Sequence, residues 1–135
     1  MSQENVETVR RLYEAVALRD TFSLYDADLE WDATRSRWSE VLDVPTTFRG
    51  HAGLRAFFRH YFEMWETFED ELQELIDTGE KVISVVTSRG RGRSSGIEIE
   101  WSGQAGLWTI RTGKIVHVAW FPTREEALEA ARGSA

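Results

Sequence analysis

The 135 residues include no cysteine. A disulfide framework, a thiol nucleophile and a zinc site built from thiolates are therefore excluded. Other metal ligands also lack a pattern, because no histidines or acidic residues stand at a convincing metal-ligand spacing, such as two histidines four apart on a helix. We expect no metal centre, and we expect His51 and His60 to be solvated.

Positive charge is scarce as well. The chain has 16 Lys and Arg residues against 23 Asp and Glu residues, for a formal net charge of −7. Nucleic-acid affinity comes mainly from basic side chains that neutralise phosphates, so we expect no nucleic-acid partner. There is no apolar run long enough for a membrane span and no signal-peptide pattern at the start. We therefore expect a cytoplasmic protein without a membrane partner.

One stretch, TSRGRGRSSGIEIEW at residues 87–101, differs from the rest of the chain in its high density of arginine. Its alternating arginines and glycines are compatible with a small RNA-binding arm. However, strand-like sequences at 81–91 and 97–110 flank it, so we interpret it as the tip of a β-hairpin.

The two possible hairpin registers give the arginines the same kind of partner. A turn at the two serines places Arg91 opposite Glu98, and it places Arg89 opposite Glu100. A turn one residue later places Arg93 opposite Glu98, with Arg91 opposite Glu100. Arginine faces glutamate across the ladder in both cases, which is a favourable pairing that neutralises the arginines locally.

Apolar periodicity divides the chain, residues 1–135, into the elements of a single domain. Helical spacing predicts helices at 3–19, 51–66 and 122–133, the last with a capping box formed by Thr123 and Glu126. Strand patterns occupy 29–34, 81–91, 97–110 and 115–121, and a further strand ends near a turn at 77–79. Residues 35–50 have no clean period and read as a loop.

Aromatic residues are plentiful, at six Trp, seven Phe and three Tyr. Any one of them is most simply a core residue, but a chain of this size needs fewer. We expect some to line an apolar pocket that favours flat, ring-bearing small molecules. The candidate ligand-binding residues are Trp31, Phe58, Tyr61, Trp65, Trp101, Trp108 and Trp120, together with the polar Gln104.

Five stretches follow one another in a recognisable order. They are VETVRRLYEAV, DLEWDA, FRGHAGLRAFFRHYFEMWE, ELIDTGEKVISVV and LWTIRTGKIVHVAWFPTREEALEAA, and they span nearly the whole chain. In this order they resemble the nuclear transport factor 2-like superfamily, in particular its SnoaL-like branch. Each stretch is a weak motif alone, whereas their order and spacing are specific.

The resemblance implies an α+β cone, in which a strongly bent antiparallel sheet wraps around helices and leaves a central apolar pocket. It also implies a homodimer formed through the outer face of the sheet. The superfamily includes ketosteroid isomerases, polyketide cyclases, scytalone dehydratase and limonene epoxide hydrolase, as well as catalytically silent binding modules. The fold alone therefore does not determine the chemistry.

Asp32 and Tyr13 are the candidate catalytic residues that the resemblance suggests. The isomerases keep a general-base aspartate near Asp32, although the ungapped match falls on Ala33, and one residue reverses the direction of a strand side chain. Asp32 is thus either a pocket base reached through a bulge or a solvated surface acid. Tyr13 lies near an oxyanion-stabilising tyrosine of the isomerases, or is simply a core aromatic residue.

Other polar positions weaken the catalytic case. Many SnoaL-like relatives carry a histidine near Gly106, and the isomerases carry a second acid near Gly103; this chain has neither. Gln104 could orient a ligand carbonyl or hydroxyl group, or lie on the outer face. We expect His117 on the outer, dimer-facing side of the last strand, and Trp38 in a lid over the pocket.

Two classes of function follow. The first is a small cofactor-independent isomerase, cyclase or dehydratase that acts on an apolar cyclic ketone, polyketide or epoxide. Asp32 would be its base, and Tyr13 or Gln104 would hold the substrate oxygen. The second is a non-catalytic ligand-binding or dimerisation module of the same fold. The direction of the Asp32 side chain separates the two classes.

Overall fold

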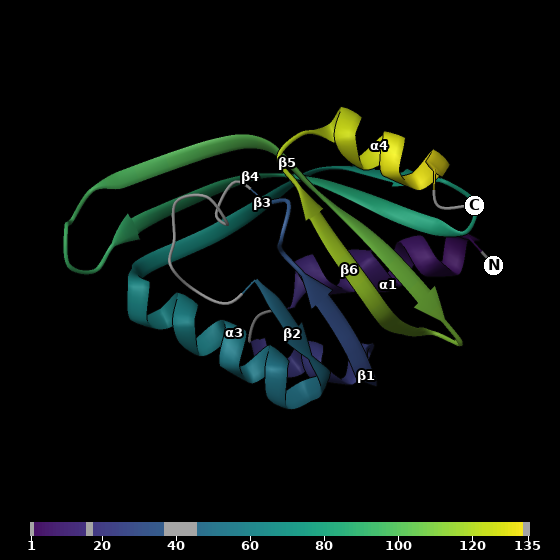
Figure 1. Cartoon of the computed structure of the whole chain (residues 1–135), viewed down its shortest axis with the longest axis horizontal. Coiled ribbons are helices and arrows are strands. Elements are labelled where there is room, and N and C mark those ends of the chain that lie inside the picture. The colour runs from purple at the N-terminus through teal and green to yellow at the C-terminus, as the bar shows by residue number, and fades with distance from the viewer. Residues whose placement is uncertain (1, 16–17, 37–45, 134–135) are drawn as a thin grey trace.

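The computed structural model describes residues 2–15, 18–36 and 46–133. In this part of the chain, six strands form one sheet in the order β2-β1-β6-β5-β4-β3 (Figure 1). The strands are β1 (Tyr25–Asp32), β2 (Thr47–Arg49), β3 (Trp65–Asp77), β4 (Lys81–Gly92), β5 (Glu98–Arg111) and β6 (Lys114–Phe121). The helices are α1 (Ser2–Glu14), the 3-10 helix η1 (Leu18–Leu24), α3 (Gly50–Met64) and α4 (Arg124–Gly133).

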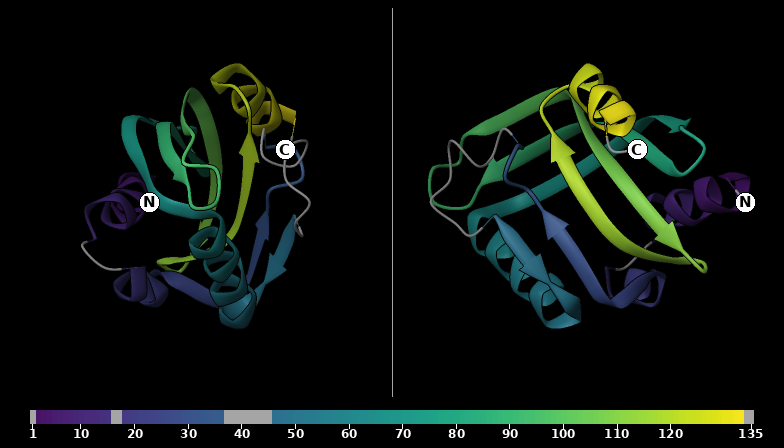
Figure 2. Two further views of the ribbon diagram at one scale, coloured as in Figure 1. Left: turned by 90° about the vertical axis from the view of Figure 1, so that its left-hand side faces the viewer. Right: turned by 45° about the vertical axis from the view of Figure 1, so that its right-hand side comes forward.

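The sheet has two differently covered faces. It bends around α1 and α3, while α4 packs on the opposite face over β4, β5 and β6 (Figures 1 and 2). The inner core joins the two helices to the concave face through the buried residues Val9, Leu29, Leu54, Phe57, Val82, Val86, Ile110 and Val118, among others. The outer core is smaller and contains Ile83, Val85, Ala105, Leu107, Phe121 and Ala127.

This architecture confirms the predicted α+β cone. Two details differ from the expectation of a purely antiparallel sheet. β1 pairs with β6 in parallel, so the sheet is mixed. The strand order has two separate ends, β2 and β3, so the sheet is open within the described residues. Those residues also contain no helix that is both long and apolar enough to cross a membrane.

The hairpin of β4 and β5 has the first of the two predicted registers. Arg91 pairs with Glu98 and Arg89 pairs with Glu100. The Gly92 N–H donates to the Ile97 carbonyl over 3.0 Å, so four residues form the loop where we expected two. Figure 1 shows this hairpin extending well beyond the rest of the sheet.

The hairpin loop is tied back to the end of α3 by one arginine. The Arg93 guanidinium donates to the Phe62 carbonyl over 2.8 Å and to the Trp65 carbonyl over 3.1 Å. These carbonyls belong to the last turn of α3 and the first residue of β3, where a helix leaves carbonyl groups without intrahelical partners. Arg93 therefore acts as a structural anchor, and the arginine–glycine stretch is built into the fold.

The turn and the helix cap in the second half of the chain have the conformations that their residue types favour. Thr112 and Gly113 both have positive φ, at 53° and 76°, which is the pattern of a type I′ hairpin turn between β5 and β6. The Glu126 N–H bonds Thr123 Oγ1 over 3.2 Å, which is the first half of the predicted capping box. The Glu126 carboxylate accepts from the Thr123 hydroxyl instead of completing the second half.

The first third of the chain differs most from prediction. α1 ends at Glu14, five residues earlier than the predicted end at 19, and β1 begins at Tyr25, four residues before the predicted start at 29. β2 lies inside the predicted loop. Its residue Phe48 pairs with Trp31 of β1 and is buried. A short strand of this kind is stabilised by a distant partner, which local periodicity does not reveal.

The last strand also departs from simple alternation. Strict alternation places Ile115 on the outer face with His117, but Ile115 belongs to the inner core. The register of β5 against β6 shifts between Thr109 and Ile110, and this bulge turns Ile115 inward. Beyond the bulge the prediction holds, since Val118 and Trp120 face the inner core while Phe121 belongs to the outer one.

Candidate functional site

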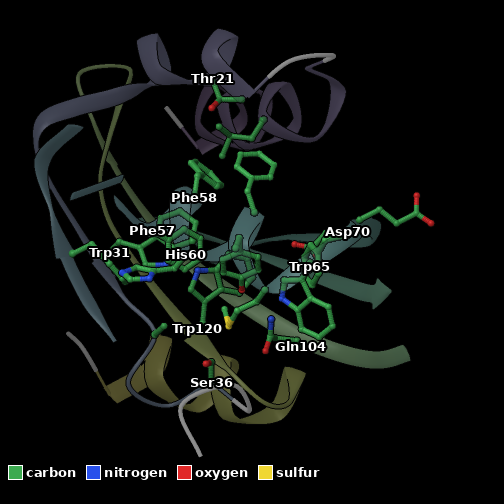
Figure 3. Close-up of a pocket in the computed structure, with 18 of the residues that line it drawn as sticks. Thr21, Trp31, Ser36, Phe57, Phe58, His60, Trp65, Asp70, Gln104 and Trp120 are labelled. Atoms are coloured by element: carbon green, nitrogen blue, oxygen red, sulfur yellow. The ribbon is translucent and has the colours of Figure 1, made fainter. Parts of the chain in front are cut away.

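A cavity of about 900 Å³ lies between the concave face of the sheet and the helices α1 and α3 (Figure 3). Its wall is dominated by aromatic residues: Tyr13, Tyr25, Trp31, Phe48, Phe57, Phe58, Tyr61, Phe62, Trp65, Phe68, Trp108 and Trp120. The polar lining consists of Thr21, Ser36, Thr46, His60, Glu66, Thr67, Glu69, Asp70 and Gln104. In Figure 3, Thr21 and Ser36 lie at opposite ends of this lining.

Trp31 is the centre of the aromatic wall. Its ring centroid lies 4.6 Å from Phe57 of α3, 5.8 Å from Trp120 of β6 and 6.3 Å from Trp108 of β5. The contact with Trp108 is edge to face, at an interplanar angle of 88°. These are favourable arrangements for aromatic pairs, so rings from four elements hold one another in place.

Most of the predicted ligand-binding residues border this cavity. Trp31, Phe58, Tyr61, Trp65, Gln104, Trp108 and Trp120 all do, and so does Tyr13. Trp101 does not border it, although it lies opposite Ser88 across β4 and β5. Binding by these residues stays a prediction, whereas their position on one wall is a property of the fold.

Gln104 reaches the inner face because of a bulge. Gln104 pairs with Val86 and Ser102 pairs with Thr87, which leaves Gly103 as an extra residue in β5. Gly103 has a φ of 92°, a conformation that glycine adopts without the steric cost of a side chain. The bulge brings the Gln104 side chain into the cavity wall, where only 5% of its surface is exposed.

Asp32 lies outside the cavity lining. It follows Trp31 in β1, so its side chain leaves the strand on the other face, and its Oδ1 accepts the Thr34 N–H over 2.9 Å. The bulge that would have turned it inward is absent at this point, where Trp31 and Asp32 pair in sequence with Val118 and Ala119. The geometry thus corresponds to the alternative in which Asp32 is a turn-forming acid, and it does not support Asp32 as the pocket base.

A different carboxylate lines the cavity. Asp70 lies in β3 between Phe68, which lines the cavity, and Leu72, which packs on the inner core. The buried Ser88 Oγ donates to Asp70 Oδ1 over 2.5 Å. The Asp70 residue as a whole is exposed to solvent, because it borders the open cavity. Its carboxylate is nevertheless desolvated by the protein atoms around it.

The desolvation raises the pKa of Asp70, and the hydrogen bond from Ser88 opposes that rise. A carboxylate with a raised pKa is a stronger base than an ordinary surface acid. It is also easier to protonate near neutral pH. Both properties are suited to proton transfer.

Two tyrosines stand close to Asp70. Burial raises the pKa of Tyr13 well above its ordinary value; the hydrogen bond with Ser84 opposes the rise, and the negative charge of Asp70 adds to it. Burial likewise raises the pKa of Tyr61, again with a contribution from Asp70. Both phenols therefore stay protonated and keep an O–H group that can donate to an oxygen atom in the cavity.

Tyr13 belongs to a hydrogen-bonded chain of three residues. The Trp108 Nε1–H donates to Ser84 Oγ over 2.8 Å, and Ser84 Oγ lies 2.8 Å from the Tyr13 hydroxyl. Ser84 is fully buried on β4, so this chain ties α1 to the centre of the sheet. It fixes the position of the Tyr13 phenol at the cavity wall.

Three other polar atoms in the wall lack such partners. Trp31 Nε1, Trp120 Nε1 and Gln104 Oε1 are buried and have no hydrogen-bond partner among the residues that the structure describes. Buried polar atoms are nearly always paired in folded proteins, because an unpaired one costs about 1–3 kcal/mol. Two N–H donors and one acceptor are therefore unpaired among the described residues, and they are buried behind the surface of the wall.

The histidines His117 and His51 contact other groups of the fold. His117 lies on the outer face as predicted, with Nε2 3.5 Å from Glu30. His51 is half-buried and its Nε2 lies 3.0 Å from the Tyr25 carbonyl, so it is not simply solvated. The prediction that Trp38 forms part of a lid lies outside the described residues. Within residues 2–15, 18–36 and 46–133, no group of three His, Asp or Glu side chains could hold a metal ion.

Sequence reasoning missed Asp70 and His60 as cavity residues. Asp70 alternates with Phe68 and Leu72, so a period of two already placed it on their face. The inward direction of β3 was the missing information. His60 was assigned to the polar side of α3, but it is half-buried, lines the cavity and has its ring 6.3 Å from Phe48. The strand that contains Phe48 was itself not predicted.

Comparison with solved structures identifies the same fold in proteins of low sequence identity. An NTF2-like protein from Burkholderia xenovorans is 27% identical, with a TM-score of 0.72 and coverage of 97% of both chains. TerC, co-crystallised with polyporic acid, is 21% identical, with a TM-score of 0.74 and coverage of 97% of this chain and 99% of its own.

A third similar structure is a hypothetical protein from Catenulispora acidiphila with a ketosteroid isomerase-like fold, in complex with trimethylamine. It is 13% identical, with a TM-score of 0.69 and coverage of 96% of this chain and 92% of its own. No curated protein matches the chain in sequence. The family model of the SnoaL-like domain matches residues 9–118, which is most of the chain and covers β1 to β5 and the first part of β6. The chain belongs to the SnoaL-like domain family.

Proposed function

We propose that this protein binds a small, ring-bearing and largely apolar molecule in its aromatic cavity. The cavity itself is the observation that carries this proposal. At about 900 Å³ it is within the size range of sites for drug-sized ligands, and its wall combines aromatic rings with a few polar atoms, as such sites do. The co-crystallisation of TerC with polyporic acid and of the Catenulispora protein with trimethylamine supports small-molecule binding in this fold.

A thermal-melt screen tests the binding proposal. The probes are steroids, flat polyketides, terpene epoxides and bicyclic ketones such as 1-tetralone. A ligand that binds only the folded state stabilises it by about 2.7 kcal/mol at one hundred times its dissociation constant. We expect at least one class to raise the melting temperature. If no class does so with well-folded protein, the proposal is wrong and the chain is better described as an interaction module.

A specific observation favours a second function, which is catalysis on the bound molecule. Asp70, Tyr13 and Tyr61 all line one cavity, and the charge of Asp70 acts on both phenols. A base beside two neutral O–H donors is an arrangement suited to enolisation. We propose that Asp70 takes the role that the sequence suggested for Asp32.

In the proposed reaction, the Asp70 carboxylate removes a proton from the carbon next to a substrate carbonyl. The electron pair of the C–H bond forms a C=C bond, and the carbonyl π pair moves to oxygen as an enolate. Tyr13 or Tyr61 donates a hydrogen bond to that oxygen. The protonated Asp70 then returns the proton to the same or another carbon, which regenerates the carboxylate and completes an isomerisation without any cofactor.

Deuterium exchange tests this mechanism without knowledge of the natural substrate. 1-Tetralone carries exchangeable protons beside its carbonyl, and exchange in D₂O can be followed by proton NMR. General-base catalysis contributes about 10²–10⁴ in rate, so we expect Asp70→Asn to slow exchange by at least about a hundredfold. Asp32→Asn is the matched control and should exchange like the wild type.

The outcomes separate the possibilities. Loss of exchange in Asp32→Asn with normal exchange in Asp70→Asn would return the base to Asp32. Binding of 1-tetralone without any catalysed exchange by the wild type would favour a binding module. Binding of 1-tetralone by both variants is measured in the same samples. A variant that still binds 1-tetralone but exchanges slowly has lost the base and not the binding site.

We also propose the homodimer that the family resemblance implies. The outer face of β1 and β2 carries a polar group in which Glu30 accepts from Arg49 over 2.8 Å and lies 3.5 Å from His117. Such a surface is compatible with a polar subunit interface. Light scattering after size exclusion should give twice the mass of one chain, and the mass of a single chain would contradict the proposal.

A further inference from the structure

Asp70 and Ser88 face each other near one edge of the sheet. β3 is the last strand in the sheet order, so β4 is its only neighbouring strand among the described residues. Asp70 of β3 pairs with Ser88 of β4 in the antiparallel register, which places both side chains on the same face. Ser88 is therefore in a position to orient the carboxylate that borders the cavity (Figure 3).

The contact between the two side chains is a short hydrogen bond. Ser88 Oγ lies 2.5 Å from Asp70 Oδ1, which is within the range of about 2.5–2.7 Å for a hydroxyl that donates to an ionised carboxylate. Ser88 is 1% exposed, so water hardly competes for its hydroxyl. Burial raises the pKa of Asp70, and this bond opposes the rise because it stabilises the ionised form.

The bond engages one carboxylate oxygen and leaves the other available. Asp70 Oδ1 accepts from Ser88, whereas Oδ2 has no hydrogen-bond partner among the described residues. Ser88 itself does not border the cavity, so a ligand touches Asp70 without touching Ser88. Any influence of Ser88 on a bound molecule therefore passes through Asp70.

No charged side chain of the described residues takes over this role. The phenols of Tyr13 on α1 and Tyr61 on α3 are close enough to sense the charge of Asp70, and both stay protonated. Arg89 follows Ser88 in β4 but points to the outer face, where it contacts three glutamates. Burial and the Ser88 hydrogen bond are thus the two influences that set the pKa of Asp70.

We infer that Ser88 is a positioning residue for the proposed proton transfer: its hydroxyl holds Asp70 Oδ1, so that Oδ2 is free to take the proton from the carbon beside the substrate carbonyl. The proton moves from that carbon to Oδ2 and back, and Ser88 keeps its own proton throughout. This inference rests on the catalytic role proposed for Asp70 and adds the residue that orients its carboxylate and keeps it ionised.

The pH profile of deuterium exchange into 1-tetralone, after subtraction of the uncatalysed rate, tests the inference. Only the ionised Asp70 can remove a proton, so exchange rises with pH through its pKa. A hydrogen bond to a charged group corresponds to about one unit of pKa, so Ser88→Ala should move the pH of half-maximal exchange upward by about one unit. Affinity for 1-tetralone should be unchanged, because Ser88 does not border the cavity.

Thr87→Val is the matched control for Ser88→Ala. Thr87 is the preceding buried residue of β4, and its hydroxyl contacts Ser102 on β5 rather than Asp70. We expect Thr87→Val to keep the wild-type midpoint of exchange. A second control places Ser88→Ala in the Asp70→Asn background, where it should cause no further loss of exchange because its target is gone.

A carbon NMR titration of the side-chain carboxyl groups, without ligand, measures the same link directly. The signal that is missing from Asp70→Asn identifies Asp70, and in Ser88→Ala it should titrate about one pH unit higher than in the wild type. This readout separates positioning from a purely structural role, which would lower the melting temperature of Ser88→Ala and leave the titration in place.

The outcomes for the inference and for the proposed function are distinct. A wild-type midpoint of exchange in folded Ser88→Ala would overturn the inference, and so would an equal loss of exchange in the Asp70→Asn background. A wild type that binds 1-tetralone without exchanging it would contradict the proposed catalysis instead. The carbon titration then decides whether Ser88 controls the Asp70 carboxylate, and an unshifted Asp70 signal would overturn that link.

Discussion

The two faces of the β4–β5 hairpin differ in how completely their polar groups are paired. On the outer face, Arg89 contacts Glu100 over 2.7 Å and Glu71 over 3.2 Å, and Arg91 lies 3.4 Å from Glu66. On the inner face, Gln104 keeps an unpaired amide oxygen in a nearly closed wall. The exposed groups, which water could have solvated, are paired, and the buried group, which water hardly reaches, is not.

This contrast shows that a conspicuous pattern in the sequence need not mark a functional surface. Arg89 and Arg91 attracted attention in the sequence because they are conspicuous, but their pairing across the ladder uses their charge locally. Gln104 is inconspicuous in the sequence, yet its unused hydrogen-bonding capacity is a feature that the fold alone does not account for. The arginine–glycine pattern is therefore explained by pairing within the sheet.

We expect the largest effect from Ser84, a polar residue of the inner face that bonds two partners. Ser84→Ala leaves both the Trp108 N–H and the Tyr13 hydroxyl without their shared partner. Each such buried group costs about 1–3 kcal/mol, so urea denaturation should show a loss of at least about 1 kcal/mol.

Ser102→Ala is the matched control for Ser84→Ala. Ser102 is exposed on the neighbouring strand, and its hydroxyl accepts only a long 3.5 Å contact from Thr87. We expect its unfolding free energy to stay within about 0.5 kcal/mol of the wild type. An equal loss in both variants would mean that the hydrogen-bonded chain through Ser84 does not matter.

A smaller effect should follow from Asp70, whose raised pKa carries a cost in stability. Because the folded-state pKa lies above the ordinary value of 3.8, the folded protein holds the Asp70 proton more tightly than the unfolded chain does. The penalty is absent below pH 3.8 and grows as the pH rises through the folded-state pKa.

Asp70→Asn removes this penalty and can still accept from Ser88. We expect its melting temperature to exceed that of the wild type by about 2 °C at pH 7, with the gap closing as the pH falls to 3. Other acids titrate alike in both proteins, so the gap reports on Asp70. A gap that stays constant over this range, or a lower melting temperature at pH 7, would contradict the pKa assignment.

The smallest effect is expected at the outer face. Arg89→Gln removes the cation that three carboxylates share, but these groups are exposed and water screens them. We expect little change in the melting temperature at physiological salt and a modest decrease at low salt, where screening is weak. A large, salt-independent loss would show that the outer ladder matters as much as the inner face.

The parts of the fold that the sequence predicted are those with strong local signals. The helix α3 and the turn at Thr112 and Gly113 follow from patterns within a few residues. Such patterns also reduced the β4–β5 hairpin to two registers, one of which pairs Arg91 with Glu98 as observed. The parts that it missed depend on distant partners. β2 exists because Phe48 pairs with Trp31, and Ile115 turns inward because of a register shift with β5.

The candidate site shows the same division. The abundance of aromatic residues predicted the cavity wall, and most of the named rings border it. Family resemblance pointed to an acid on β1, where one residue decides the direction of Asp32, and the structure places that side chain outside the cavity lining. Asp70 becomes recognisable only when β3 is known to face the cavity and Ser88 is known to lie beside it.

The most direct measurement of the central claim is a two-dimensional proton–nitrogen NMR titration with 6-hydroxy-1-tetralone, observed at the indole N–H signals of the six tryptophans. We predict that the signals of Trp31 and Trp120 move on binding, because a ring that fills the cavity packs against both indoles. Trp108, already bonded to Ser84, should move less, and Trp101, which does not border the cavity, should stay in place. Binding that shifts Trp101 while leaving Trp31 and Trp120 unchanged would contradict the account.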